Sequence, residues 1–305
     1  MPNYSGSWNL VQQMQAVAAS NWPIQPVQPG TVAIFALGNA SGASSTRDKY
    51  TFSGCVVSSG AAASAASFYS SAAGNSTVGI FALGYTTAPS TTRNKYTYSG
   101  CVNSSATAAT AASYAGSAAG NSTVGIFALG NYTTTRDKYT YSGCVVSSGA
   151  AASAASNIGS AAGNSTVGIF ALGYVCGLGG TTCRNKYTYS GCVSASATAS
   201  SAVSGIGSAA GNSTVGIFAL GYSSTTRNKY TYSGDVNASA TASSATSYAG
   251  SAAGNSTVGI FAIGNCSTTR NKYTYSGDVN ASAAAATAAS TEGSAASNGT
   301  CGVNM

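Results

Sequence analysis

The sequence contains no histidine and only five acidic residues in a chain of 305. Histidine is the usual general base and the commonest metal ligand, so its absence removes the ordinary means of acid–base and metal-assisted catalysis. The five acids are dispersed along the chain and form no paired carboxylates: Asp48, Asp137, Asp235, Asp278 and Glu292. We therefore expect no enzymatic activity, no cofactor and no metal site.

Long apolar segments are also missing. No stretch is long and apolar enough to cross a bilayer, so membrane insertion is not expected. The first 20 residues have no basic region and no continuous apolar stretch of signal-peptide length. We therefore expect the chain to fold in the cytoplasm where it is made.

What the sequence does contain is repetition. A motif, TVGIFALG, occurs six times with small changes, and a degraded seventh copy, TCGVNM, ends the chain. Successive copies lie 43 to 48 residues apart. From the arginine of a second motif, TTRNKYTYSG, to the next copy of the first there are always 30 residues. All variation in length therefore falls in one loop per repeat, between the glycine of FALG and that arginine.

Each repeat has room for four short strands. TVGIFALG is a short apolar run closed by glycine, which indicates a buried strand, and KYTYSG alternates as a strand with unlike faces does. About twenty small residues follow, enough for two more strands, and GNST supplies glycine and asparagine where a tight hairpin needs positive φ. The size of this unit is that of a β-propeller blade. We predict an all-β, six-bladed β-propeller; a linear β-solenoid is the alternative.

These residues resemble a known family. An apolar strand ending in glycine, a variable loop, a tyrosine-bearing strand and a Gly–Asn turn follow the layout of Kelch-like propeller repeats and, more loosely, of RCC1-like arrays. The repeats depart from Kelch repeats in having a single glycine and no tryptophan in the later strand. GIFALG and TRDKYTYSG within Ala/Ser/Gly-rich arrays also look like repeats of bacteriophage tail-fibre and other virion proteins. The resemblance implies a virion component.

All twelve basic residues lie in the second motif: Arg47, Lys49, Arg93, Lys95, Arg136, Lys138, Arg184, Lys186, Arg227, Lys229, Arg270 and Lys272. A propeller would arrange them as a ring. One interpretation is structural: a solvated rim in which each arginine hydrogen-bonds an adjacent turn and each lysine deters edge pairing. The other is a basic ring that binds phosphate or an acidic sugar. Nucleic acid is not the expected partner, because no run of basic residues occurs.

The variable loops are the predicted binding sites. They are rich in Tyr, Asn, Ser, Thr and Gly, which are common in adaptable binding loops. Loops on a rigid scaffold are the usual place for recognition. The candidate ligand-binding residues are Tyr85, Thr86, Thr87, Tyr132, Tyr174, Leu178 and Tyr222. For the three shortest loops, unselected polar turns are the simpler interpretation.

The eight cysteines fall into two kinds. Cys176 and Cys183 flank GLGGTT in the longest loop and could close it with a disulfide. Four others hold equivalent positions in successive repeats, too far apart in a propeller to pair: Cys55, Cys101, Cys144 and Cys192. Cys266 and Cys301 have no evident mate.

Two domains of unequal size are predicted. Residues 1–30 form an attachment segment, with an amphipathic helix and a Pro-rich linker, and residues 31–305 form the propeller closed by a C-terminal strand. We expect the attachment segment to contact other virion proteins, the chain to be a homo-oligomer and the loops to bind host-envelope glycan. For the N-terminal helix, packing on its own propeller is the alternative. The alternative function is a structural decoration or spacer without a ligand of its own.

Overall fold

The computed structural model describes residues 30–39, 41–53, 56–99, 102–142, 145–176, 179–190 and 193–298. Within these ranges the regular elements are all strands. No helix there is long and apolar enough to span a membrane. The predicted N-terminal helix and most of the Pro-rich linker lie outside the described residues.

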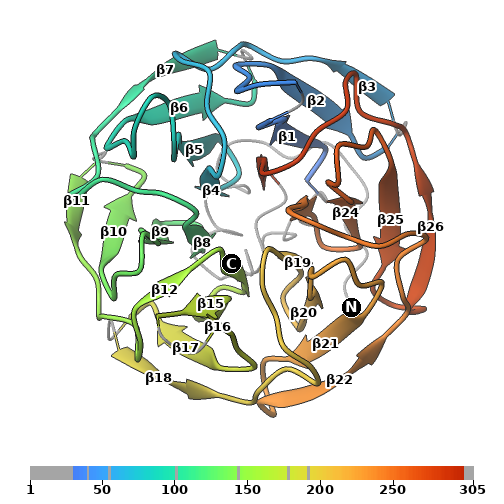
Figure 1. The fold of residues 1–305 in the computed structure, drawn as a ribbon. Coiled ribbons are helices and arrows are strands. Elements are labelled where there is room, and N and C mark those ends of the chain that lie inside the picture. Colours follow the sequence, from blue (N-terminus) through green and yellow to red (C-terminus); the bar gives the residue numbers. More distant parts are fainter. Residues whose placement is uncertain are drawn as a thin grey trace, which may run out of the picture.

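Six four-stranded antiparallel sheets form the blades of a propeller (Figure 1). The innermost strands are β27 (Ser294–Ser297), β4 (Ser71–Gly74), β8 (Ser117–Gly120), β13 (Ser160–Gly163), β19 (Ser208–Gly211) and β23 (Ser251–Gly254). The second strands are β1 (Val32–Ala36), β5 (Val78–Ala82), β9 (Val124–Ala128), β14 (Val167–Ala171), β20 (Val215–Ala219) and β24 (Val258–Ala262).

The third strands are β2 (Arg47–Thr51), β6 (Arg93–Thr97), β10 (Arg136–Thr140), β17 (Arg184–Thr188), β21 (Arg227–Thr231) and β25 (Arg270–Thr274). The outermost strands are β3 (Val56–Ser59), β7 (Val102–Ala106), β11 (Val145–Ser148), β18 (Val193–Ala197), β22 (Val236–Ala240) and β26 (Val279–Ala283). A small extra sheet joins β12 (Ser156–Asn157), β15 (Tyr174–Val175) and β16 (Gly179–Gly180). Blades are numbered 1 to 6 from the one containing β1.

The ring is closed by the C-terminal strand. β27 pairs with β1 in antiparallel register, with Ile34 opposite Ala296, and β27 also contacts β4 of blade 2. Asn298 then exchanges two hydrogen bonds with Val32, at 2.8 and 3.0 Å. A linear solenoid would leave these first and last strands apart, so the six-bladed propeller is the correct prediction.

Six hydrophobic clusters occupy the six interfaces between blades. One joins Ile80 of blade 2 to Phe127 and Tyr139 of blade 3, and the other five repeat this arrangement around the ring. Each VGIFA strand is therefore buried on both faces, as its unbroken apolar sequence predicted. The tyrosines of the third strand close each cluster from the other side.

The small residues of the repeat have a steric reason. A Cβ added at Gly74 or Gly79 would lie 2.6 or 2.8 Å from Tyr98 Oη. In blade 1 the residue equivalent to Tyr98 is Phe52, which has no hydroxyl, and alanine and serine stand at the two glycine positions: Ala33 and Ser297. Glycine thus stands at these two positions where the hydroxyl is present, and larger residues stand there in the blade where it is absent.

The GNST turn forms in the predicted place for a different reason from the one predicted. Gly74 and Asn75 lie outside the positive-φ region. Instead, Asn75 Oδ1 accepts hydrogen bonds from Thr77 N, Thr77 Oγ1 and Val78 N at 2.9–3.0 Å. Asn75 Nδ2 donates to Ser122 O of the next blade at 3.1 Å. The asparagine is therefore both a turn former and a link between blades.

The arginines cross the blade interfaces. Each guanidinium carbon lies 4.5–4.7 Å from the centroid of the FALG phenyl ring of the next blade, in a series that runs full circle to Arg270 over Phe35. Each arginine also donates a hydrogen bond to the asparagine or aspartate that follows the arginine of that next blade. Only 1–2% of each arginine is exposed.

The predicted rim of solvated arginines is therefore wrong, and the arginines form no exposed basic ring. Their main partners are side chains of the next blade; the predicted bond to a backbone carbonyl is found for Arg136, whose Nη1 donates to Ala151 O at 3.4 Å. Stacking on an aromatic ring lets a guanidinium be buried with part of its charge compensated. Burial lowers the pKa to about 10 in four of them: Arg47, Arg136, Arg184 and Arg227. The lysines are half-buried on the same strands.

The interfaces are of two kinds, which differ in the residue that accepts the hydrogen bond from the arginine. Arg93 and Arg270 meet aspartates, Asp137 and Asp48, at 2.8 Å. In the blades that contain the aspartates, blades 3 and 1, the residue at the second position of the outermost strand is valine: Val146 and Val57.

The other kind has asparagine as the first partner. At three of these interfaces the outermost strand supplies a second polar group, as when Asn237 accepts from Arg184 Nη1 at 2.8 Å and Asn280 from Arg227 Nη1 at 2.7 Å. Ser194 does the same for Arg136. Loss of the negative charge is thus accompanied by gain of a neutral acceptor.

Candidate functional site

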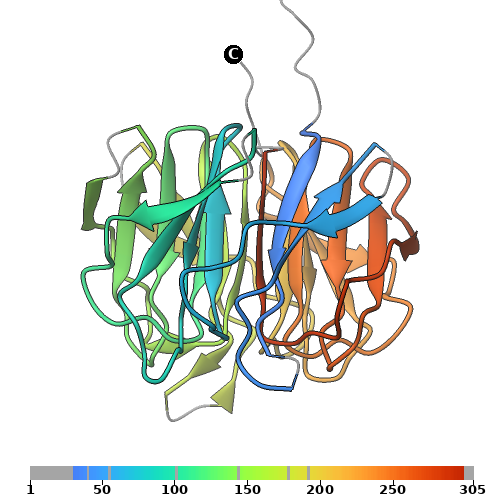
Figure 2. The ribbon, with the colours of Figure 1, turned by 90° about the horizontal axis from the view of Figure 1, so that it is seen from above.

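The variable loops and the connections between blades lie at one end of the propeller, here called the loop face. Each variable loop leaves the second strand at the end where the innermost strand of the same blade begins. The two segments are joined: Phe68 and Tyr85 exchange backbone hydrogen bonds of 3.0 and 2.9 Å. Figure 2 shows the β15–β16 hairpin projecting beyond the other loops of this face.

The short loops are closed by tight turns. In the third repeat Asn131 and Tyr132 both have φ of 53°, and Thr133 N donates to Gly130 O at 2.9 Å. This is the geometry of a type I′ turn, which is ordered by its own backbone. The same pair of positive φ values occurs at 222–223 and 265–266. Tyr132 and Tyr222 are consequently held outward, 50% and 41% exposed.

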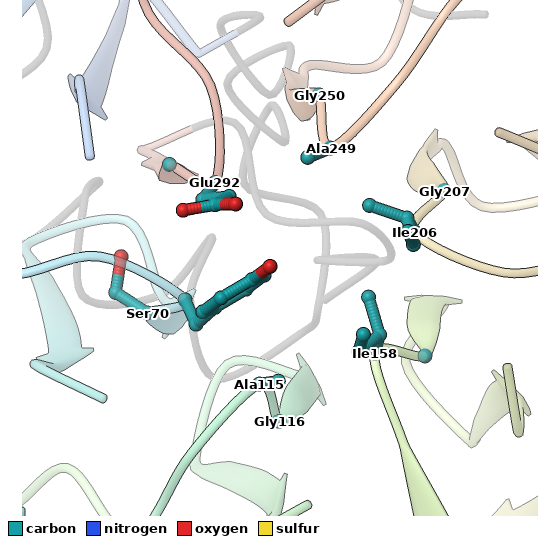
Figure 3. Close-up of a pocket in the computed structure, with 12 residues that line it drawn as sticks. Ser70, Ala115, Gly116, Ile158, Ile206, Gly207, Ala249, Gly250 and Glu292 are labelled. Carbon is teal, nitrogen blue, oxygen red and sulfur yellow. The ribbon is translucent and has the colours of Figure 1, made fainter. Parts of the chain in front are cut away.

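A closed circle of backbone hydrogen bonds surrounds the channel at the loop face. It joins one residue of each blade, donor to acceptor, at 2.7–3.1 Å. All six residues have φ of 52–59°: Tyr69, Ala115, Ile158, Ile206, Ala249 and Glu292. Such φ values cost energy for residues other than glycine and persist only where the surroundings impose them. We call these residues the mouth ring; Figure 3 shows the side chains of Ile158, Ile206 and Glu292 pointing toward the channel axis.

An aromatic cluster lies beside the mouth ring. Phe68, Tyr69, Tyr85 and Tyr114 have ring centroids 5.0–5.7 Å apart, two of the contacts being edge-on. All four side chains are half-buried, so part of each ring is accessible. The cluster joins Tyr85, a predicted loop residue, to residues of the blade connections.

Glu292 and two tyrosines form a polar network in this region. Tyr69 donates a hydrogen bond to the Glu292 carboxylate, and its ring meets that of Tyr114 edge-on. Burial, together with this bond and the charge of Glu292, raises the pKa of Tyr69 well above its ordinary value. Burial and the same carboxylate raise the pKa of Tyr114. Both hydroxyls are therefore protonated at neutral pH, and the proton of Tyr69 is the one donated to Glu292.

A second pair of tyrosines lies two blades away. Tyr174 and Tyr222 have ring centroids 5.4 Å apart and share a hydrogen bond. That bond, with burial, raises the pKa of Tyr174 to about 12. The pair packs over Gly205, where a Cβ would meet Tyr222 Cε2 at 2.7 Å and Tyr174 Cε2 at 3.0 Å. A glycine in the neighbouring connection thus makes room for both rings.

The predicted loop residues are not brought together at one point. Tyr85 belongs to the aromatic cluster, Tyr174 and Tyr222 form their own pair, and Tyr132 is exposed by itself. Thr86 is half-buried and Thr87 is exposed. Leu178 lies outside the described residues.

The predicted disulfide is absent. Cys176 and Cys183 are free, exposed thiols. Val175 pairs with Gly179, and Leu172 N donates to Cys183 O, so Cys176 is near the tip of the hairpin and Cys183 at its base. They are offset by about four residues, roughly 13 Å at strand spacing, whereas a disulfide needs Cα atoms within about 7 Å. Five cysteines lie outside the described residues: Cys55, Cys101, Cys144, Cys192 and Cys301.

Comparison with known proteins identifies the architecture only. No known family model matches the sequence, and no curated protein matches it. The solved structure of TolB from Acinetobacter baumannii is similar, with a TM-score of 0.60 and 10% identity over 87% of this chain and 66% of that chain. The fold is that of a β-propeller. The chain spans just under two thirds of the length of that structure, and at this identity the likeness concerns the fold alone.

Sequence reasoning missed the mouth ring and most of the aromatic cluster. A signal was present: the residue two places before each SAA varies, from tyrosine to alanine, isoleucine and glutamate, while SAA itself is constant. Glu292, the single glutamate, occupies one of these positions. Among the described residues no group of cysteines and acids has the arrangement of a metal site.

Proposed function

We propose that this chain is a non-enzymatic binding propeller of a bacteriophage virion, of the tail-fibre or surface-fibre type, whose loop face binds glycans of the host envelope. The Kelch-like layout and the resemblance to phage virion repeats support the setting. In that setting the N-terminal segment attaches the propeller to other virion proteins, and the chain assembles as a homo-oligomer.

The distribution of differences between repeats carries this proposal. The arginine–phenylalanine contacts recur at all six interfaces, as a common scaffold requires. The loop face, in contrast, presents a different set of side chains from each blade, and an irregular ligand needs such differences. Tyr132 and Tyr222 offer exposed aromatic area there, and aromatic rings suit the apolar faces of sugars.

The test exchanges native loops within the chain. Residues 85–92 are replaced by NYTTT of the third repeat, and residues 174–183 by YSSTT of the fifth. Both replacements already connect the same two strands elsewhere, so we expect an unchanged melting temperature. Binding of the labelled protein to an array of bacterial surface glycans, and to host cells, should fall at least tenfold.

A matched control alters the lysines and leaves the loops intact. Lys95→Ala and Lys138→Ala change half-buried bases on third strands and should leave glycan binding unchanged. Normal binding by the loop-exchanged protein, with loss of binding in the lysine variants, would assign recognition to the bases. If the parent protein binds no glycan and no host cell, the spacer interpretation is correct and the proposal fails.

A further inference from the structure

The mouth ring surrounds a small hollow of about 40 Å³ that is open to solvent at the loop face. A hollow of this size holds about three water molecules. It can therefore admit a small substituent of a sugar, while the sugar ring itself lies at the open side.

The hollow has one polar and one apolar side. Glu292 and Tyr69 are neighbours in the ring, since Tyr69 N donates to Glu292 O at 2.8 Å. Across the axis lie Ile158 and Ile206, also neighbours, with Ile206 N donating to Ile158 O at 3.0 Å. Figure 3 shows Glu292 facing the two isoleucines across the channel, and alanines separate the two sides.

The polar side retains unused hydrogen-bonding capacity. An ionised carboxylate has about four acceptor positions, and Tyr69 occupies one of those of Glu292. The other described acids are placed differently: Asp48 and Asp137 are buried beside arginines, and Asp235 and Asp278 lie in turns between third and outermost strands. Glu292 is thus the acid that faces the channel mouth.

Backbone strain is concentrated at the same place. Six non-glycine residues with positive φ in one circle hold their side chains in a fixed arrangement before any ligand arrives. Ligands bind more tightly to sites that need no ordering. The accessible edges of the aromatic cluster lie alongside and can receive the sugar that follows the terminal one.

We propose that the mouth ring binds the terminal residue of a surface glycan, a hexopyranose with an apolar substituent such as an N-acetyl group. The sugar hydroxyls donate to the remaining acceptor positions of the Glu292 carboxylate, which Tyr69 holds in place, and the methyl group packs against Ile158 and Ile206. This inference deepens the proposed function and rests on it, because it names the terminal N-acetylated sugar as the group that the loop face recognises.

The probes are the methyl glycosides of N-acetylglucosamine and N-acetylgalactosamine, each compared with its unacetylated counterpart, glucose or galactose. Binding is followed by titration calorimetry and by saturation transfer from the protein to the sugar. We expect at least one acetylated glycoside to bind at least tenfold more tightly than its counterpart.

Two variants separate the polar and apolar contributions. Glu292→Ala should weaken both members of the preferred pair at least tenfold, whereas Ile158→Ala should weaken mainly the acetylated sugar and so reduce the discrimination. Alanine already stands in the mouth ring as Ala115 and Ala249 with the same φ, so both variants are expected to fold. Val236→Ala, an exposed side chain on the outermost strand β22, is the matched control and should bind normally.

The outcomes distinguish this inference from the proposed function. If loop exchange abolishes glycan-array binding while Glu292→Ala binds like the parent, the mouth ring is not the site and the proposed function stands. Equal binding of acetylated and unacetylated sugars by the parent also overturns the inference. If neither the array nor any glycoside is bound, both fail.

Discussion

The guanidinium of Arg93 and the carboxylate of Asp137 meet at 2.8 Å between the second and third blades, and both side chains are fully buried. Asp137→Asn keeps the shape of the partner and removes its charge. Breaking a buried ion pair typically costs 3–5 kcal/mol, so we expect the free energy of unfolding to fall by about 3 kcal/mol. Denaturant titration measures this loss.

The interfaces with an asparagine partner suggest how to restore the stability that Asp137→Asn loses. Adding Val146→Asn to Asp137→Asn places an acceptor where Asn237 and Asn280 serve Arg184 and Arg227. We expect the double variant to recover about 1 kcal/mol, the usual net worth of one hydrogen bond. In the parent, Val146→Asn alone should destabilise, since Val146 packs on the core. If the Asp137→Asn variant and the double variant were equally stable, a polar residue at position 146 would not compensate for the charge lost at position 137, and the explanation would be wrong.

The steric relation of Gly79 to Tyr98 predicts a second pair of coupled variants. Gly79→Ala places a Cβ 2.8 Å from Tyr98 Oη, and overpacking of this kind costs about 2 kcal/mol. In a Tyr98→Phe background the same substitution should cost about 1 kcal/mol less. Blade 1 already combines Ala33 with Phe52. A thermodynamic cycle of the four proteins gives the coupling, and a value of zero would refute the steric explanation.

Tyr98 also predicts behaviour in alkali. Burial raises its pKa well above 10, so the folded chain keeps this proton after the unfolded chain has lost it. The associated stability is complete below pH 10 and declines above it, by up to about 1.4 kcal/mol per pH unit. Between pH 10 and 11.5 the stability of Tyr98→Phe should therefore fall less steeply than that of the parent. The exposed Tyr132→Phe is the control and should match the parent slope.

The bonds between Asn298 and Val32 predict that the chain can be reconnected. They match those of the internal turn, where Asn75 N donates to Val78 O and Val78 N to Asn75 Oδ1. Joining residue 298 to residue 31 through one serine, and opening the chain between residues 164 and 165, should give a permutant that melts within a few degrees of the parent. A chain truncated before Ser294 should not fold cooperatively. Failure of the permutant together with folding of the truncated chain would contradict the role of β27.

The fold could be predicted from the sequence because a constant 30-residue interval with one variable loop leaves few arrangements for four strands. The strands fall where the apolar and alternating patterns indicated. The positions of the arginines could not be predicted in this way. Periodicity says that Arg93 recurs once per blade, but whether it meets solvent or Phe127 depends on how two separate sheets face each other.

The candidate site was only partly predictable for a related reason. Sequence variation marked the loops, and Tyr85, Tyr174 and Tyr222 do lie on the loop face. The mouth ring is formed by residues about 43 to 48 positions apart whose proximity exists only after closure. Tyr69 and Glu292 are 223 positions apart in the sequence yet adjacent in the ring, so no local pattern could have paired them.

Closure by β27 also bears on how the molecule reaches its folded state. The SAAS of β27 differs by one residue from the SAAG of the other inner strands. During folding, the edge of β1 stays unpaired until β27, the last described strand of the chain, is available to pair with it. Until β27 pairs with β1, an inner strand of a second molecule can pair with the same edge of β1. Concentrated refolding should therefore yield interlocked dimers that exchange terminal strands, while synthesis at low concentration favours the self-closed ring.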